Sequence, residues 1–202
     1  EQLPEVTEQQ AGLQVISKQR VTDYGEVYTH PREVNAMLDL VEQETARIES
    51  RFLEPACGTG NFLVEILNRK LAVVAERYAR SQFEYERYAV LAISSIYGID
   101  ILLDNVTACQ TRLFDIFNQQ YTNLFKKDTK EQCCHAVKFI LRCNILQGDA
   151  LTLKTVSEPI KPIIFSEWSA VNGNLLKRRD FIYGDLVDRA SYREMPLFSD
   201  LD

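Results

Sequence analysis

FLEPACGTGNFL, residues 52–63, decides the fold because it joins an apolar strand to a Gly-X-Gly turn and the start of a helix. Gly58 and Gly60 allow backbone angles that other residues rarely adopt, so the chain can turn tightly and approach a ligand closely. Asn61 begins a predicted helix whose free N–H groups and dipole favour a negative group. Glu54 ends the strand, where open α/β sheets bind their ligands. The stretch therefore predicts a ligand site at the carboxyl edge of a sheet.

Composition narrows the class of protein. The chain has 202 residues and 46% apolar content, which predicts one globular α/β domain with a sizeable core. A net charge of −6 argues against a protein that grips duplex DNA alone, because phosphate contacts require a basic face. The dense basic cluster Lys177, Arg178 and Arg179 is typical of a solvated surface.

Location and cysteine chemistry follow from the same composition. No apolar run reaches the length of a membrane span, and the polar, acidic N-terminus has no secretory character. We therefore expect a cytoplasmic protein without a membrane partner. The five cysteines show no CxxC spacing, which indicates reduced thiols. Cys133, Cys134 and His135 lack a fourth ligand nearby, so we expect no metal.

Strands alternate with helices along the chain, which predicts a doubly wound, mostly parallel sheet with helices on both faces. The predicted strands are 51–54, 97–101, 144–146 and 159–165. The predicted helices are one from Pro31 to about residue 48 capped by Thr29, one from Asn61 to Tyr78, and those at 82–97, about 104–125 and 131–142. Aromatic side chains in 82–97 are expected in the core rather than against nucleic-acid bases.

Four motifs, in this order and spacing, resemble the adenine-N6 DNA methyltransferases of restriction-modification systems. The motifs are DYGEVYTHPREVNAMLDL (23–40), FLEPACGTGNFL (52–63), YGIDI (97–101) and NILQGDAL (144–151). The resemblance implies a class I, Rossmann-like methyltransferase fold with S-adenosyl-L-methionine (AdoMet) as cofactor. It also implies a DNA-methylating enzyme that acts on the exocyclic amine of adenine in a restriction-modification or defence system.

The implied cofactor-binding residues follow from these motifs. In the family, the threonine before the first helix touches the methionine end of AdoMet, which points to Thr29 with Tyr28 beside it. The family pattern reads threonine-proline, whereas His30 stands between Thr29 and Pro31 here, so the helix start is displaced. The full set is Tyr28, Thr29, Glu54, Pro55, Ala56, Gly58, Gly60, Asn61, Phe62, Asp100, Ile101, Asp149, Ala150 and Leu151.

Three acids end successive predicted strands, and the carboxyl ends of adjacent strands line one crevice. Asp100 can accept both ribose hydroxyls of AdoMet, and Asp149 can accept a hydrogen bond from the adenine amine. Ile101 and Leu151, the apolar residues that follow, are expected to hold the two faces of the adenine. The three carboxylates, which are those of Glu54, Asp100 and Asp149, are expected to face a single ligand.

The family's catalytic motif, Asn/Asp/Ser-Pro-Pro-aromatic, is absent, because no two of the six prolines are adjacent. The fourth strand is expected to end near Ser166, Glu167 and Trp168. One interpretation is a divergent target pocket, in which Ser166 or Glu167 accepts hydrogen bonds from the target amine and Trp168 stacks on the flipped base. The other is a pocket that has lost its chemistry, which the missing prolines favour slightly.

The expected organisation is an N-terminal arm (1–22), an AdoMet-binding domain (23–168) and an irregular tail (169–202) that could add one strand at 181–183. Few residues follow the fourth strand, so we expect an incomplete sheet with an exposed edge that invites another chain, a partner subunit or a second copy. The alternatives are a catalytically reduced AdoMet-binding subunit or scaffold of a defence complex, and a methyltransferase for RNA or small molecules.

Overall fold

The computed structural model describes residues 29–171 and 175–190. The predicted arm at 1–22 and the proposed cofactor residue Tyr28 lie outside the described residues.

A three-stranded parallel sheet forms the centre of the molecule. Its order is β1 (Phe52–Glu54), β2 (Ile96–Asp100) and β3 (Ile145–Gln147). Glu54 pairs with Gly98, and Asp100 pairs with Gln147, so all three strands end at the same edge. Each of these strands was predicted to within one or two residues.

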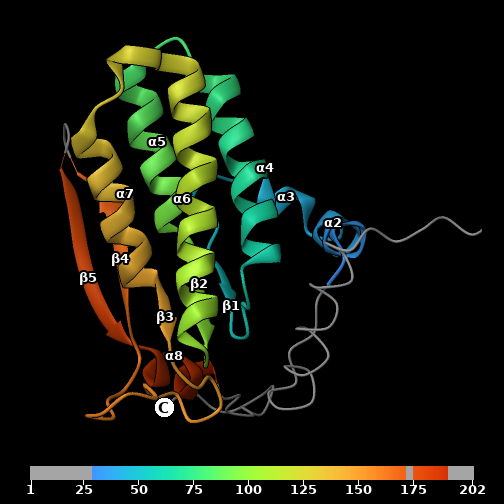
Figure 1. Ribbon diagram of the computed structural model, residues 1–202, viewed down its shortest axis with the longest axis vertical. Coiled ribbons are helices and arrows are strands. Elements are labelled where there is room, and N and C mark those ends of the chain that lie inside the picture. Colours follow the sequence, from blue (N-terminus) through green and yellow to red (C-terminus); the bar gives the residue numbers. More distant parts are fainter. Residues whose placement is uncertain (1–28, 172–174, 191–202) are drawn as a thin grey trace, which may run out of the picture.

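Long helices connect the strands and run side by side beyond the ends of the short sheet (Figure 1). The helices α4 (Asn61–Tyr78) and α5 (Gln82–Ser94) lie between β1 and β2 in the chain. The helix α6 (Leu103–Phe125), a 3-10 turn η1 (Lys126–Asp128) and the helix α7 (Glu131–Asn144) lie between β2 and β3. The molecule is therefore an α/β protein with a small, incomplete parallel sheet, which confirms the predicted class at this coarse level.

The helices bury apolar stripes that the sequence pattern predicts. Leu63, Leu67, Leu71 and Val74 of α4 recur at three- and four-residue spacing, and all are fully buried. Tyr85 of α5 is also fully buried and stacks with Tyr121, with ring centroids 6.1 Å apart. The prediction that the aromatic residues of this segment serve the core is confirmed for Tyr85, whereas it is wrong for Phe83, which is 41% exposed.

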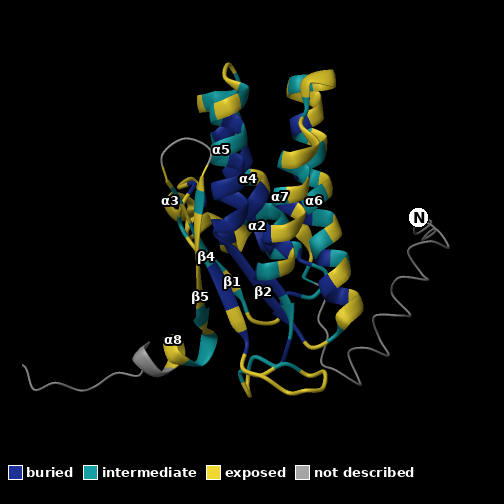
Figure 2. Cartoon of the chain, turned by 90° about the vertical axis from the view of Figure 1, so that its left-hand side faces the viewer, coloured by how far each residue is buried: buried dark blue, intermediate teal, exposed yellow. Residues whose placement is uncertain are grey.

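An antiparallel hairpin packs against the other face of the sheet. Tyr97 and Ile99 of β2 point away from the helices and contact Ile163 and Phe165. The hairpin consists of β4 (Ile164–Ala170) and β5 (Leu176–Ile182), and the helix α8 (Tyr183–Ala190) follows it. Figure 2 shows the hairpin on one side of the central strands and α6 with α7 on the other.

Two predictions about this region are wrong. The fourth strand begins at Ile164 rather than near residue 159, and it pairs antiparallel with β5 instead of joining the parallel sheet. The face of the sheet at Tyr97 is packed by this hairpin, not by a layer of helices. The physical reason is that β4 and β5 place Phe165 opposite Phe181, and this aromatic pair packs on the side of β2 that carries Tyr97 and Ile99.

The N-terminal helix is divided and has a different cap from the one predicted. The helix α2 (Pro31–Asp39) is followed by the short helix α3 (Glu42–Thr45). His30, not Thr29, is the N-cap, because its Nδ1 accepts a hydrogen bond of 3.2 Å from the N–H of Arg32. The helix does not continue to residue 48 because Val41 adopts non-helical angles, with φ −122° and ψ 30°.

None of the helices in the described part of the chain has the length and apolar character needed to cross a membrane. All five cysteines are free thiols.

Candidate functional site

The glycine turn lies between β1 and α4 and has one packed side and one open side. Gly58 and Gly60 have φ values of 52° and 89°, in the region that glycine tolerates best. A Cβ on Gly60 would lie 2.5 Å from Cys109 Sγ, so this glycine is needed for close contact with α6. A Cβ on Gly58 would have no neighbouring atom within 4 Å. The turn is therefore held on the side of α6 and open at Gly58.

Asp100, at the end of β2, holds this turn through its side chain. Its Oδ2 accepts a hydrogen bond of 2.9 Å from the N–H of Gly58. Its Oδ1 accepts from the N–H of Leu102 at 2.8 Å and from Nδ2 of Asn105 at 3.2 Å. A carboxylate offers about four acceptor positions, so these three bonds leave room for a further donor. Asp100 is 9% exposed, so little of it remains accessible to a ligand.

Glu54 and Asp100 lie around one buried thiol. The contact of Cys57 with Cys109 raises the pKa of the Cys57 thiol, as do its burial and the nearby carboxylates of Asp100 and Glu54. Burial raises the pKa of Glu54, against the effect of a hydrogen bond from the N–H of Ala56. The structure thus brings two of the three predicted acids to one place and gives Glu54 an environment that disfavours its charge.

Asp149 follows β3 at the same edge, but its carboxylate accepts hydrogen bonds within the turn that follows it. Its Oδ1 accepts hydrogen bonds from the N–H groups of Leu151, at 2.8 Å, and Thr152, at 3.4 Å. The bond from Leu151 lowers the pKa of Asp149. The backbone still connects the ends of β3 and β2, because the N–H of Gly148 donates to the carbonyl of Asp100 at 2.9 Å. Asp149 is adjacent to the site, with its side chain turned into the loop that follows.

The apolar residues predicted to hold an adenine are exposed at this edge. Ile101 is 47% exposed and Leu151 is 95% exposed. Ala150 is half-buried and packs with the hairpin cluster. Of the other predicted contacts, Pro55 and Ala56 are exposed in the glycine turn, whereas Phe62 is half-buried against the core. The edge therefore presents apolar surface beside Asp100.

Thr29 is held next to the glycine turn by Asn61, the first residue of α4. Nδ2 of Asn61 donates a hydrogen bond of 3.3 Å to the carbonyl of Thr29. Thr29 itself is half-buried. Two residues far apart in the sequence, both predicted to bind the cofactor, are thus brought together.

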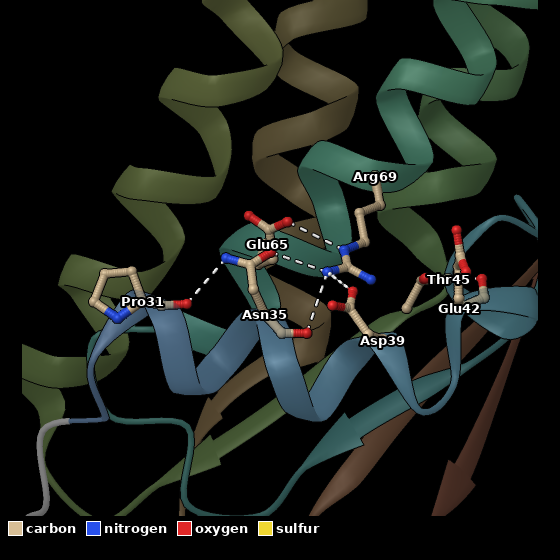
Figure 3. A network of polar contacts seen from close by, with 7 residues as sticks. All are labelled: Pro31, Asn35, Asp39, Glu42, Thr45, Glu65 and Arg69. Carbon is tan, nitrogen blue, oxygen red and sulfur yellow. Dashed lines mark hydrogen bonds and ion pairs between the residues drawn. The ribbon is translucent and has the colours of Figure 1, made fainter.

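Arg69 of α4 links this helix to α2, which begins two residues after Thr29 (Figure 3). Its Nη2 donates to Oδ1 of Asn35 at 2.9 Å and to Oδ1 of Asp39 at 2.8 Å. Its Nε donates to Oε1 of Glu65 at 3.1 Å. Arg69 is only 19% exposed, so these bonds are partly shielded from water.

Arg112 of α6 also contacts the site, and the sequence pattern gave no signal for it. Its Nη1 donates to the carbonyl of Thr59, to Oγ1 of Thr59 and to Oδ1 of Asn61. A shallow hollow of about 790 Å³ lies beside it, lined by Leu103, Asp104, Thr107, Ala108, Thr111 and Arg112. This hollow is on the outer side of α6 and does not include Glu54 or Asp100.

Ser166, Glu167 and Trp168, the predicted catalytic residues, lie inside β4 and not at the end of a parallel strand. Ser166 is 1% exposed, and its Oγ donates to Oδ1 of Asp180 at 2.7 Å. Glu167 forms an ion pair with Arg51. Trp168 packs edge-on against Phe139 of α7, with ring centroids 6.0 Å apart. The predicted position of these residues is wrong, because antiparallel pairing with β5 commits their side chains to packing and ion pairs.

Among residues 29–171 and 175–190, no group of three or more His, Cys, Asp or Glu side chains is arranged to hold a metal ion. Comparison with protein-family models, curated proteins and solved structures found no match to this chain. The chemistry of the site therefore rests on its own residues.

Proposed function

We propose that this protein binds AdoMet at the carboxyl edge of its parallel sheet, as a unit of an adenine-N6 DNA methyltransferase system with a class I, doubly wound fold. The observation that carries the proposal is the open side of Gly58 next to the carboxylate of Asp100. A glycine with free space at its Cβ position lets a ligand lie directly on the backbone. A strand-end carboxylate beside it can accept the hydroxyl groups of a ribose.

The described residues fit the three chemical parts of AdoMet. Asp100 retains acceptor capacity for the ribose, and the exposed side chain of Ile101 offers an apolar surface to the adenine. Glu54 supplies negative charge in a partly buried position, which favours a cationic ligand. Thr29 lies across the glycine turn through its bond to Asn61, where the resemblance places the methionine end.

The proposed reaction uses these residues for binding and orientation. AdoMet supplies a methyl group on a positively charged sulfur, which a nucleophilic amine can displace. The chain's part is to fix the ligand so that this methyl group is presented in one direction, a contribution that can amount to several kcal/mol of the barrier. The acceptor proposed is the exocyclic amine of adenine in DNA, and the net charge of −6 favours a partner that supplies the phosphate contacts.

A second candidate function is AdoMet binding without methyl transfer, in a reduced subunit or scaffold. The observation that favours it is the commitment of Trp168 to Phe139 and of Ser166 to Asp180. A target pocket needs an aromatic face and a free acceptor for the flipped base. In this candidate the site would sense AdoMet or contribute to a complex in which another chain provides the catalytic groups.

The test is a calorimetric titration of the purified protein with AdoMet. In Gly58→Ala, the added methyl group meets no neighbouring atom, so the fold loses only the roughly 1 kcal/mol that a left-handed residue costs. The methyl group would occupy the space where the ligand lies, so we expect binding at least about tenfold weaker. Gly184→Ala is the control for a methyl group added away from the site, because its Cβ would make only ordinary contacts, the nearest at 3.7 Å.

If both variants bind AdoMet as the unaltered protein does, the site is elsewhere, and if the unaltered protein does not bind, the proposed function is wrong. Transfer of labelled methyl groups to DNA, with and without partner subunits, then separates the two candidates. Incorporation favours the enzyme, and binding without incorporation under all these conditions favours the reduced subunit.

A further inference from the structure

Arg112 reaches from α6 to the glycine turn and makes three hydrogen bonds there with one nitrogen. Its Nη1 lies 2.7 Å from the carbonyl oxygen of Thr59, 3.1 Å from Oγ1 of Thr59 and 2.9 Å from Oδ1 of Asn61. The side chain is half-buried, and all three acceptors are neutral oxygens. Bonds from a guanidinium to such acceptors are charge-assisted and stronger than neutral ones.

Asn61 extends this contact to the segment before α2. Its oxygen accepts from Arg112, and its Nδ2 donates to the carbonyl of Thr29 at 3.3 Å. Only this orientation of the amide satisfies both neighbours, since a guanidinium cannot accept and a carbonyl cannot donate. Arg112 therefore fixes the amide of Asn61, and through it the position of Thr29.

The turn needs such restraints because glycine has wide backbone freedom. Thr59 lies between Gly58 and Gly60, which both have positive φ. Asp100 holds the N–H of Gly58 from the side of the sheet. Arg112 holds the carbonyl of Thr59 from the side of α6, so the turn is clamped from both sides.

We propose that Arg112 is a positioning residue, which holds the glycine turn and, through Asn61, Thr29 in the geometry that receives the ligand. This role rests on the proposed function, because the ligand it serves is the AdoMet of that site. Arg112 acts through Thr59 and Asn61 and does not itself belong to the surface that touches the ligand. A turn left free would have to be ordered on binding, and this ordering would weaken the affinity.

The test compares Arg112→Met, Arg112→Lys and Arg142→Met. Methionine keeps the apolar stem but cannot donate, whereas lysine restores a positive donor on a flexible stem. Arg142, on the exposed side of α7, is the control for loss of one arginine. Binding of S-adenosylhomocysteine is measured by calorimetry, and hydrogen exchange is measured on the peptide that covers residues 55–62.

The expected result is a loss of affinity of about tenfold or more in Arg112→Met, since one charge-assisted bond corresponds to at least this factor. Exchange in the 55–62 peptide should rise in the same variant, while the peptides of α5 and α7 exchange as before. Arg112→Lys should recover part of the affinity, and Arg142→Met should match the unaltered protein.

The outcomes separate the two claims. If the unaltered protein binds and Arg112→Met binds equally well, the positioning role is wrong and the proposed function stands. If affinity falls but exchange rises throughout the protein and Arg112→Lys gives no recovery, Arg112 is only a general stabiliser and the inference is overturned. If the unaltered protein does not bind S-adenosylhomocysteine, the proposed function fails and the positioning role fails with it.

Discussion

Asp100 is the residue on which the candidate site depends most, because its carboxylate joins the end of β2 to the glycine turn. Its two oxygens accept hydrogen bonds from Gly58, Leu102 and Asn105. In Asp100→Asn, one oxygen becomes a donor and at least one of these N–H groups loses its acceptor. We expect a loss of about 2 kcal/mol in the free energy of unfolding, measured by urea denaturation.

Asp115→Asn serves as the control for Asp100→Asn, because Asp115 is an exposed carboxylate on α6. Its change should stay within about 0.5 kcal/mol. Equal stabilities of the two variants would show that the bonds of Asp100 contribute nothing to the turn.

Glu54 should give the site a pH dependence. Burial raises its pKa above 4.5, so in the folded protein it takes up a proton at a higher pH than an exposed glutamate. A cationic ligand favours the charged form, so affinity for AdoMet should fall as the pH is lowered from neutral through the raised pKa of Glu54. Glu54→Gln should bind more weakly at neutral pH and lose this dependence, as calorimetry at several pH values would show.

The same shift has a consequence for stability with the opposite sign. Because the folded state holds the proton more tightly than the unfolded chain, the contribution of Glu54 is fully present below pH 4.5 and is lost as the pH rises through its raised pKa. Without ligand, Glu54→Gln should therefore be more stable than the parent at neutral pH. A less stable variant would mean that the charged carboxylate is favoured in the fold.

At this scale the sequence predicts which residues lie at the sheet edge but not where their side chains point. Glu54 and Asp100 end β1 and β2, Asp149 lies two residues after β3, and the three do lie at one edge. The turn of Asp149 back to Leu151 depends on local loop geometry that no pattern encodes. Arg112 and Lys70 were missed because a basic residue in a helix normally indicates a solvated face. Lys70 is instead fully buried, with its Nζ bonded to the carbonyl of Ile48 and Oγ of Ser95.

Among the elements, α2 is the one whose position matters most to the site, because it begins two residues after Thr29. Arg69 is the partly buried link between α2 and α4. Burial works against its charge, but the hydrogen bonds that it donates to Asp39 and Glu65 raise its pKa. In Arg69→Met, the bonds to Asn35 and Asp39 are lost. We expect a loss of about 1–2 kcal/mol in the free energy of unfolding and faster hydrogen exchange in residues 31–39.

Arg77→Met is the matched control for the α2 prediction. Arg77 is exposed in the last turn of α4, the helix that also carries Arg69. In Arg77→Met, hydrogen exchange in α2 should equal that of the unaltered protein. If Arg69→Met also leaves α2 protected, then apolar contacts such as those of Val34 and Leu38 hold this helix without the arginine.

The long helices α4 and α6 were predicted well, whereas the strand β4, whose place is set by long-range pairing, was not. The apolar stripes of α4 and α6 fixed their boundaries to within about one residue, because burial of one helix face follows directly from spacing. The strand β4 was displaced and given the wrong partner. Its apolar residues suit either a parallel or an antiparallel neighbour, and only the contact of Phe165 with Phe181 and Tyr97 decides between them.

The molecule as a whole consists of a small parallel sheet with helices on one face and a hairpin on the other. Within the described residues, β1 pairs with β2 only, so its second edge carries no strand. Leu53 on this edge is 40% exposed. The alternation of predicted strands and helices indicated the α/β class, and the few residues after the fourth predicted strand indicated an incomplete sheet. Neither observation carries information about which layer covers Tyr97, since that depends on how the chain returns after β3.

The most direct test of a ligand site at the glycine turn is the ¹H–¹⁵N spectrum of the whole protein during titration with S-adenosylhomocysteine. We predict saturable shifts centred on the amides of Gly58, Gly60 and Leu102, because the ligand would lie on the turn and share the carboxylate of Asp100. Amides of β5 should move little. A spectrum that does not change, or shifts confined to the hairpin and α8, would contradict the claim that the glycine turn and Asp100 form one ligand site.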